Sequence, residues 1–179
     1  MAGTSRSLAR INQSDLLRLA ALAAETESGL FARRPHGAGR YAGRLLCRTL
    51  CQGAALHYLN GRNGVKDFDV WSFYSALGDS PFPYRWHGTA DFGVSKFGRW
   101  PGDPPSYAGR RVDFFGRSLP VAPGADPVDV LRGYLSAART ASAKELAAKA
   151  VILLSPEQLA GECVWRQAGR QDLTVRQSR

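Results

Sequence analysis

Residues 52–74 read QGAALHYLNGRNGVKDFDVWSFY, and this stretch carries most of the information about the fold. Its second half, Val65–Tyr74, is rich in β-branched and aromatic residues and predicts a strand. The first half predicts a short helix over Ala54–Asn60, and Gly61 is a suitable residue to end that helix. Gln52-Gly53 is therefore expected to form a turn that opens a helix, with a strand following the helix.

Two carboxylates stand on the predicted strand with one residue between them. Side chains alternate along a strand, so Phe68 and Val70 are expected to face the core while Asp67 and Asp69 project together from the other face. Lys66 alternates to the side opposite Asp67. Paired carboxylates supply the hard oxygen ligands that magnesium prefers. The alternative is a pair of solvated carboxylates on an exposed strand face.

A third carboxylate has the same local setting as this pair. Arg110–Arg117 (RRVDFFGR) predicts a second strand, and Asp113 lies on it between two apolar residues. Three carboxylates on adjacent strands can complete a two-ion site and supply a general base. The competing interpretation is an ion pair between Asp113 and Arg110 or Arg111. Upstream, Gly53 would let backbone N–H groups and a helix N-terminus approach a phosphate group.

This combination resembles the nucleotidyltransferase superfamily typified by DNA polymerase β, and it is similar to the abortive-infection toxin branch of that superfamily. The shared pattern is a glycine-rich turn that opens a helix, a spacer (residues 54–66), an Asp-x-Asp strand and a third carboxylate on a later strand. The resemblance covers about residues 49–74 and 110–117. It implies a small mixed sheet flanked by helices.

The resemblance also implies roles for individual residues. Asp67 and Asp69 would bind two magnesium or manganese ions, Asp113 would bind the catalytic ion and activate the acceptor hydroxyl, and Gly53 would line the phosphates. Gln52 departs from the family pattern, which has Gly-Gly or Gly-Ser at the turn. Gln52 either crowds the phosphates or replaces the serine hydroxyl as a donor. Further candidate contacts for nucleotide, phosphate or acceptor are Arg62, Lys66, Arg85, Arg99 and Arg111.

The expected function is metal-dependent transfer of a nucleoside monophosphate from a nucleoside triphosphate to an acceptor such as RNA or tRNA. One alternative is a catalytically inactive nucleic-acid-binding or partner-binding module on the same fold. A second alternative is a metal nuclease, for which Asp91 and Lys96 are the candidate pair; a salt bridge within the loop is the simpler interpretation of those two residues.

Charge and composition limit the choice of partner and compartment. The chain has 179 residues, with 24 Lys and Arg against 15 Asp and Glu, and a formal charge of +9. Only four of these cations are lysines, and an excess of arginine suits a polyanion such as RNA. Cys47, Cys51 and Cys163 predict no disulfide framework, and no apolar segment reaches the ~18 residues of a membrane span. We therefore expect a cytoplasmic protein without a membrane segment. The resemblance to the toxin branch adds a cognate antitoxin or another protein as a candidate partner.

The rest of the chain predicts an α/β (α+β) architecture. We expect a nucleotidyltransferase-like domain over residues 1–126, with an N-terminal helix at Asp15–Thr26, and a C-terminal helical segment over residues 127–179 with a basic tail from about residue 166. Within that segment the spacing predicts helices over Pro127–Ala138 and Ser142–Leu154, and Ser155-Pro156 predicts a further helix start. Residues 78–109 contain many aromatic residues, which we expect to anchor a long loop. His57 and the cysteines are expected to be packing residues.

Overall fold

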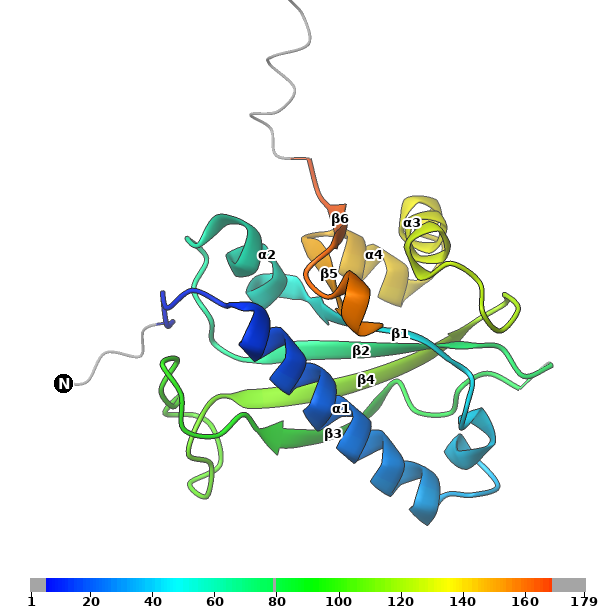
Figure 1. Ribbon diagram of the computed structural model, residues 1–179, viewed down its shortest axis with the longest axis horizontal. Helices are drawn as coiled ribbons and strands as arrows, with labels where there is room; N and C mark the ends of the chain where they lie inside the picture. Colours follow the sequence, from blue (N-terminus) through cyan, green and yellow to red (C-terminus); the bar gives the residue numbers. More distant parts are fainter. Residues whose placement is uncertain (1–5, 79, 169–179) are drawn as a thin grey trace, which may run out of the picture.

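The computed structural model describes residues 6–78 and 80–168 and has a mixed sheet with helices on both faces (Figure 1). The helices and strands are α1 (Gln13–Arg33), β1 (Leu45–Cys51), α2 (Gln52–Asn60), β2 (Phe68–Ser75), β3 (Trp86–Asp91), β4 (Arg111–Leu119), α3 (Pro127–Ala137), α4 (Ala141–Ala147), β5 (Ala150–Ser155) and β6 (Cys163–Arg166), with short 3₁₀ turns at Ala38–Tyr41 and Glu157–Leu159. The predicted α/β (α+β) class is confirmed.

The sheet order is β3-β4-β2-β1-β5-β6, so β2, β3 and β4 occupy one half and β1 with the C-terminal strands β5 and β6 the other. β1 and β2 are antiparallel neighbours, whereas β2 and β4 are parallel. In the register of that parallel pair, Asp69 stands beside Asp113. The topology therefore brings together the two acidic segments, which lie far apart in the sequence.

One apolar core lies between α1 and the sheet. Leu16, Leu19 and Ala23 on α1 are fully buried against strand residues that include Phe68 and Val70. α1 crosses this face diagonally in Figure 1. Burial of Phe68 and Val70 on this face confirms the alternation predicted for the Asp-x-Asp strand.

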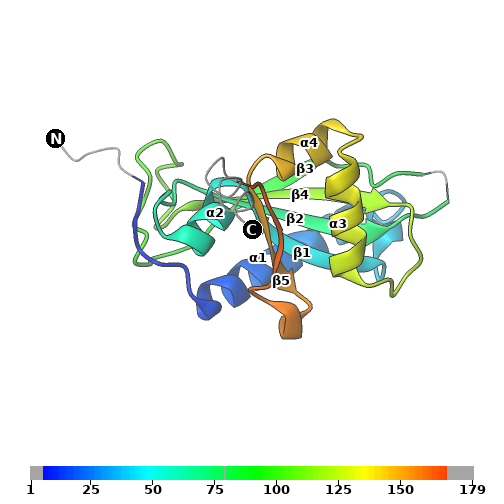
Figure 2. The same cartoon turned by 90° about the horizontal axis from the view of Figure 1, so that it is seen from above.

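A second core fills the opposite face of the sheet. Leu131 and Leu135 of α3 and Leu146 of α4 pack against Trp71 and Phe73 of β2. Figure 2 shows α4 on one side of the strands and α1 on the other. Because Asp69 and Trp71 share a strand face, Asp69 lies on the same side of the sheet as α4.

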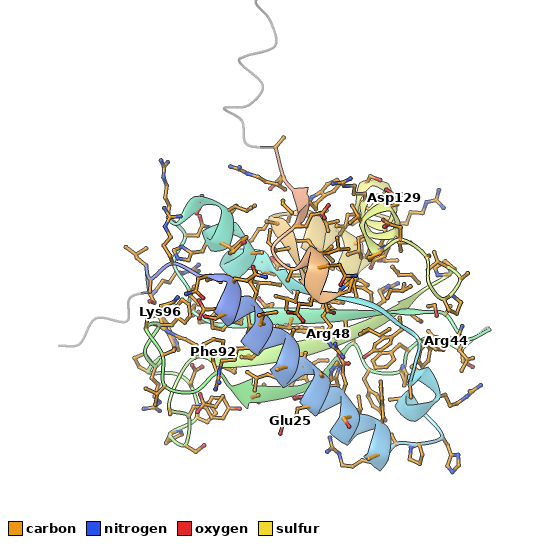
Figure 3. All side chains as sticks on the ribbon, viewed as in Figure 1. Glu25, Arg44, Arg48, Phe92, Lys96 and Asp129 are labelled. Carbon is orange, nitrogen blue, oxygen red and sulfur yellow. The ribbon has the colours of Figure 1, made fainter. Side chains whose placement is uncertain are left out.

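A buried ion pair links α1 to the sheet. Glu27 is 3% exposed, and its carboxylate accepts bonds from Arg48 Nε at 3.1 Å and Nη2 at 2.6 Å. Ser72 on β2 also donates to Glu27. Burial raises the pKa of the neighbouring Tyr74 hydroxyl. Arg48 lies beside α1 in Figure 3, whereas Glu25 is on the exposed side of that helix.

Several predicted elements need correction. α1 is longer than predicted, and its N-cap is Asn12, whose side chain accepts from Asp15 N in a capping box. Residues 150–155 form β5 rather than the end of a helix, because the apolar run AVILLS is buried between β1 and β6. Ser155-Pro156 precedes a three-residue 3₁₀ turn instead of an α-helix. The C-terminal segment is thus α3 and α4 followed by two strands of the sheet.

Other local predictions are confirmed. Gly61 ends α2 with φ 64°, and α3 begins at Pro127 as predicted. His57 is fully buried, with Nε2 3.0 Å from Ala9 O and Nδ1 accepting from Gly64 N at 3.0 Å, so it is a packing residue. Cys47 and Cys51 are free and buried. Residues 169–179, which hold most of the predicted basic tail, lie outside the described residues.

The aromatic loop is anchored through its rings, as predicted. Phe92 and Phe97 are each 2% exposed and lie 4.9 Å and 5.3 Å from the ring of Phe68. Among residues 6–78 and 80–168, no helix has the length and apolar character needed to cross a membrane.

Candidate metal and nucleotide site

Three carboxylates meet at the end of the sheet where β2 and β4 begin. Asp69 and Asp113 are register neighbours on these two strands, and Asp67 immediately precedes β2. Neighbouring strands lie about 4.8 Å apart, so the two strand carboxylates are within reach of one cation. The side chains of Asp67 and Asp113 are 24% and 13% exposed, which leaves both open to a ligand.

Arg111 stands between two of these carboxylates. Its Nε donates to Asp113 Oδ2 at 2.9 Å, and its Nη2 lies 3.4 Å from Asp67 Oδ2. The ion pair expected as the competing interpretation of Asp113 is therefore present, with Arg111 as the partner. In this conformation the described residues contain no ready cluster of three metal-ligating side chains. The guanidinium instead supplies the positive charge between the carboxylates.

Asp69 carries the strongest electrostatic signal of the site. Burial, followed by the charges of Asp67 and Asp113, raises the pKa of Asp69 to about 7, and Lys149 partly opposes that rise. A carboxyl group with a pKa this high costs the folded protein free energy when it is ionised. Perturbed carboxylates of this kind are concentrated at functional sites.

The predicted turn lies beside the carboxylates. β1 ends at Cys51, opposite Asp69 in the antiparallel register, and α2 starts at the next residue. Gln52 has φ 60°, a left-handed conformation that glycine adopts at least cost. The side chain of Gln52 donates to Glu145 O on α4 at 3.1 Å. Gln52 is thus tied to α4, and the Gly53 backbone is left to face the site.

A cavity of about 220 Å³ joins the turn to Asp67 and Asp69, whereas Asp113 and Arg111 are not among its lining residues. It is lined by Arg6, Gln52, Gly53, Ala54, Gly64, Lys66, Asp67, Asp69, Glu145 and Lys149. Three of the lining side chains are cations and three are carboxylates. This mixture suits a polyanionic ligand with bound cations, because the lining cations can contact its anionic groups and the carboxylates can contact its cations.

Three charged lining residues were not identified from the sequence. Arg6 reaches the turn from the N-terminal segment, with Nη1 3.5 Å from the point where a Cβ on Gly53 would lie. Glu145 lies on α4, and Lys149 follows that helix. The sequence offered one signal for Lys149. The chain has only four lysines, and two of them, Lys66 and Lys149, line this cavity.

The orientation predicted for Lys66 is wrong. β2 begins only at Phe68, so Lys66 lies before the strand and does not follow its alternation. Its Nζ lies 3.7 Å from Asp67 Oδ2, and the residue lines the cavity. Lys66 Nζ also lies 5.7 Å from the Trp100 ring centroid. Lys66 is therefore placed where it can contact a phosphate.

Other candidate contacts are not brought into the cavity lining. Arg85 pairs with Glu145, itself a lining residue, and so lies one contact away. Arg99 donates to the carbonyls of Asp103 and Pro104 and so organises its own loop. Arg62 follows the C-terminal residue of α2 and is not among the lining residues.

The pair considered for a nuclease is separated. Asp91 accepts N–H bonds from Gly93, Ala108 and Gly109, which close its loop, and these bonds lower the pKa of Asp91. Lys96 pairs instead with Asp15 on α1 at 2.7 Å. The predicted salt bridge between Asp91 and Lys96 is therefore wrong.

The raised pKa of Asp69 leads to a stability prediction. A carboxyl with a folded-state pKa near 7 and an ordinary unfolded-state pKa favours folding at low pH, and this contribution is lost as the pH rises through 7. Asn mimics the protonated form. We expect Asp69→Asn to be more stable than the parent protein by on the order of 2 kcal/mol at about pH 8 without metal, and equally stable near about pH 4.

Urea denaturation of both proteins at the two pH values measures this difference. Asp129→Asn, on the exposed side of α3, is the control and is expected to show no such pH-dependent gain. Equal stabilities of parent and Asp69→Asn at the higher pH would mean that Asp69 has an ordinary pKa.

Comparison of the chain with protein-family models, with curated proteins and with solved structures gives no match.

Proposed function

We propose that this protein is a metal-dependent nucleotidyltransferase that moves a nucleoside monophosphate from a nucleoside triphosphate to an acceptor hydroxyl. The observation that carries the proposal is the convergence of Asp67, Asp69 and Asp113 beside the Gln52-Gly53 turn at the start of α2. The turn, the carboxylate pair and the third carboxylate come from separate segments of the chain. Their proximity supports the proposal, because the resemblance to the nucleotidyltransferase superfamily implies that these three elements act together.

The carboxylates fit a magnesium or manganese site. Their oxygens are hard ligands, and the raised pKa of Asp69 reports a surplus of negative charge that a cation would relieve. Arg111 stands in for that cation by contacting both Asp67 and Asp113. Bound magnesium would supply electrophilic stabilisation of the phosphoryl oxygens. Asp67, Asp69 and Asp113 are the residues that would hold it.

The opposite side of the cavity suits a triphosphate. Gly53 lies in the first turn of α2, where backbone N–H groups and the helix dipole favour an anion. Arg6 lies over this turn, and Lys66 and Lys149 add two further cations to the lining. These groups would bind and orient the phosphates and would offset the charge that develops on them during transfer.

The acceptor would be activated from the β4 side. Asp113 holds its carboxylate at the edge of the cluster, with one oxygen bonded to Arg111. In the proposed reaction Asp113 accepts the proton of the attacking hydroxyl, the new bond forms at the α-phosphorus, and pyrophosphate leaves. The formal charge of +9 favours RNA as the acceptor, with tRNA as a specific candidate. A cytoplasmic location and a cognate antitoxin or other protein partner remain part of the proposal.

A second candidate function is a catalytically inactive nucleic-acid-binding or partner-binding module. The contacts of Arg111 with Asp67 and Asp113 favour it, because a permanent internal cation would make a metal unnecessary. This module would bind RNA without metal, and its affinity would fall steeply with salt.

The two candidates are separated by a transfer assay. The protein is incubated with each α-labelled nucleoside triphosphate, magnesium or manganese, and total RNA, and transfer of label to RNA is measured. We expect metal-dependent transfer with at least one triphosphate, which Asp67→Asn abolishes and Glu25→Gln preserves. Absence of transfer from all four triphosphates, with tight metal-free RNA binding, would favour the inactive module. Shortening of RNA without a triphosphate would indicate a nuclease.

Arg111 gives a prediction that does not depend on knowing the acceptor. Replacing it with Met removes the cation that competes for Asp67 and Asp113. We expect Arg111→Met to raise the affinity for Mn²⁺ about tenfold, the scale of one lost charge-assisted hydrogen bond. Paramagnetic resonance titration of free Mn²⁺ measures the change, with Arg62→Met as the control. Unchanged or weaker Mn²⁺ binding in Arg111→Met would contradict a shared site.

A further inference from the structure

A second hollow lies away from the carboxylates, between the end of β4 and α3. Its volume is about 450 Å³, larger than that of the carboxylate cavity. It is lined by the end of β4, the residues that directly follow β4, one face of α3 and the residues after that helix. We refer to it as the α3 groove. The position of Asp129 on α3 marks it in Figure 3.

α3 has two stripes of non-polar residues. Val128, Leu131 and Leu135 form the stripe that is buried in the core. A second stripe at i, i+3, i+4 and i+7, Val130, Gly133, Tyr134 and Ala137, lines the α3 groove. Val130 and Tyr134 are partly buried against the second core, while Gly133 and Ala137 are exposed, so the stripe forms a non-polar wall that a ligand can reach.

Gly133 leaves space at the α3 groove. It lies inside α3, where glycine costs about 1 kcal/mol relative to alanine. The residue is exposed, and a Cβ placed on it would meet nothing within 4 Å, so no contact within the described structure requires glycine. Because Gly133 lines the groove, a larger side chain at this position has room to occupy part of it.

Arg117 supplies an unused donor. Its Nε is buried and has no hydrogen-bond partner within the described residues. Its guanidinium carbon lies 5.6 Å from the centroid of the Tyr134 ring, and Tyr134 Oη is held 3.0 Å from Thr140 Oγ1. A buried donor without a partner costs free energy until an acceptor reaches it. The guanidinium thus lies over the Tyr134 ring, and both residues line the α3 groove.

The charge of the groove selects the sign of the ligand. Arg117 and Arg139 line it against one carboxylate, Asp129. This excess of positive charge disfavours the basic C-terminal residues of the chain as the occupant. The walls around the arginines are apolar, with Leu119, Pro120 and Val121 among them.

We propose that the α3 groove is a binding site for a small ligand with a planar ring and an anionic carboxylate or phosphate group. The ring would lie against Tyr134 and the stripe opened by Gly133, and the anion would accept from Arg117. The site is separate from the carboxylate cavity, and the inference does not rest on nucleotidyl transfer.

Calorimetric titration of the full chain, without metal, tests the proposal. The probes are phenyl phosphate and benzoate, with benzyl alcohol and inorganic phosphate as the ring-only and anion-only controls. We expect saturable binding of phenyl phosphate, benzoate or both at one site per chain, and weaker or no binding of the two controls. The preference between phenyl phosphate and benzoate identifies the anionic group that the site takes.

Two variants place the binding in the α3 groove. Gly133→Leu fills the space and improves helix propensity, so it is expected to fold at least as stably while weakening the probe about tenfold or more. Arg117→Gln is expected to weaken it about tenfold, the scale of a charge-assisted hydrogen bond. Arg132→Gln removes the same charge from α3 outside the groove lining and is the matched control.

No saturable binding of either ring anion would overturn the proposal. Binding that Gly133→Leu leaves unchanged would also overturn it, since the probe would then occupy another place. Equal binding of inorganic phosphate and phenyl phosphate would contradict the role assigned to the ring.

Discussion

Replacing Asp69 with Asn is expected to lower nucleotidyl transfer by about a thousandfold, on the scale of removing one preorganised electrostatic contact from an active site. Asp69 is the carboxylate with the strongest burial and like-charge effects, and it stands beside both Asp67 and Asp113. Asn keeps the shape of the side chain and removes the charge that would hold a cation. Initial rates of label transfer at saturating triphosphate measure the effect.

The stability of Asp69→Asn is the control that shows whether this variant is folded. Asp69→Asn is expected to be at least as stable as the parent protein at neutral and higher pH, because burial and its neighbours disfavour the charged form. A fall in transfer together with unchanged or increased stability would place the effect in the reaction. Transfer within a factor of about three of the parent rate would contradict a role for Asp69 in catalysis.

Replacing Glu27 with Ala is expected to destabilise the protein by about 3–5 kcal/mol, the scale found when one partner of a buried ion pair is removed. Glu27 is 3% exposed and accepts bonds from both Arg48 and Ser72. Its loss would leave the Arg48 guanidinium between α1 and the sheet without its counter-charge. Chemical denaturation measures the change, with Glu25→Gln on the exposed side of α1 as the control.

A double substitution separates the buried charge from simple loss of packing. Glu27→Leu combined with Arg48→Met removes both charges and keeps apolar volume, so it is expected to recover most of the stability lost in Glu27→Ala. A double variant as unstable as the single variant would show that packing or the Ser72 contact carries the effect. Neither residue lies in the carboxylate cavity, so transfer in the folded double variant should be close to that of the parent protein.

The sequence was most informative where local pattern and burial agree. The alternation of Phe68 and Val70 with Asp67 and Asp69 predicted which face each side chain takes, because a strand has a period of two. Asp113 was predicted in the same way, and the parallel register places it beside Asp69. Local patterning was sufficient to predict the strand face of these side chains, because that face depends on only a few neighbouring positions in the sequence.

Elements and contacts that depend on distant segments could not be predicted in this way. Residues 150–154 (AVILL) are all apolar, so their periodicity does not distinguish a buried helix from a buried strand, and pairing with β1 decides it. Arg6, Glu145 and Lys149 reach the cavity from opposite ends of the chain. Lys66 was assigned the wrong side because the strand starts three residues later than its composition indicated, at Phe68 instead of Val65.

The interpretation of the site depends on Arg111. Its contacts with Asp67 and Asp113 are compatible with a cation that yields to metal and with one that replaces metal permanently. The two cases differ in what happens when a triphosphate enters the cavity. A triphosphate brings negative charge that can accept the guanidinium and free the carboxylates for metal.

The central claim is that Asp67, Asp69 and Asp113 hold divalent metal together with a nucleoside triphosphate. The most direct measurement is a count of bound Mn²⁺ by paramagnetic resonance, with and without a non-hydrolysable triphosphate analogue, in the parent protein and in Asp69→Asn. We predict two ions per chain with the analogue, fewer without it, and loss of this binding in Asp69→Asn. No Mn²⁺ bound by the parent protein in the presence of the analogue would contradict the proposed function and would leave Arg111 as the permanent cation of the site.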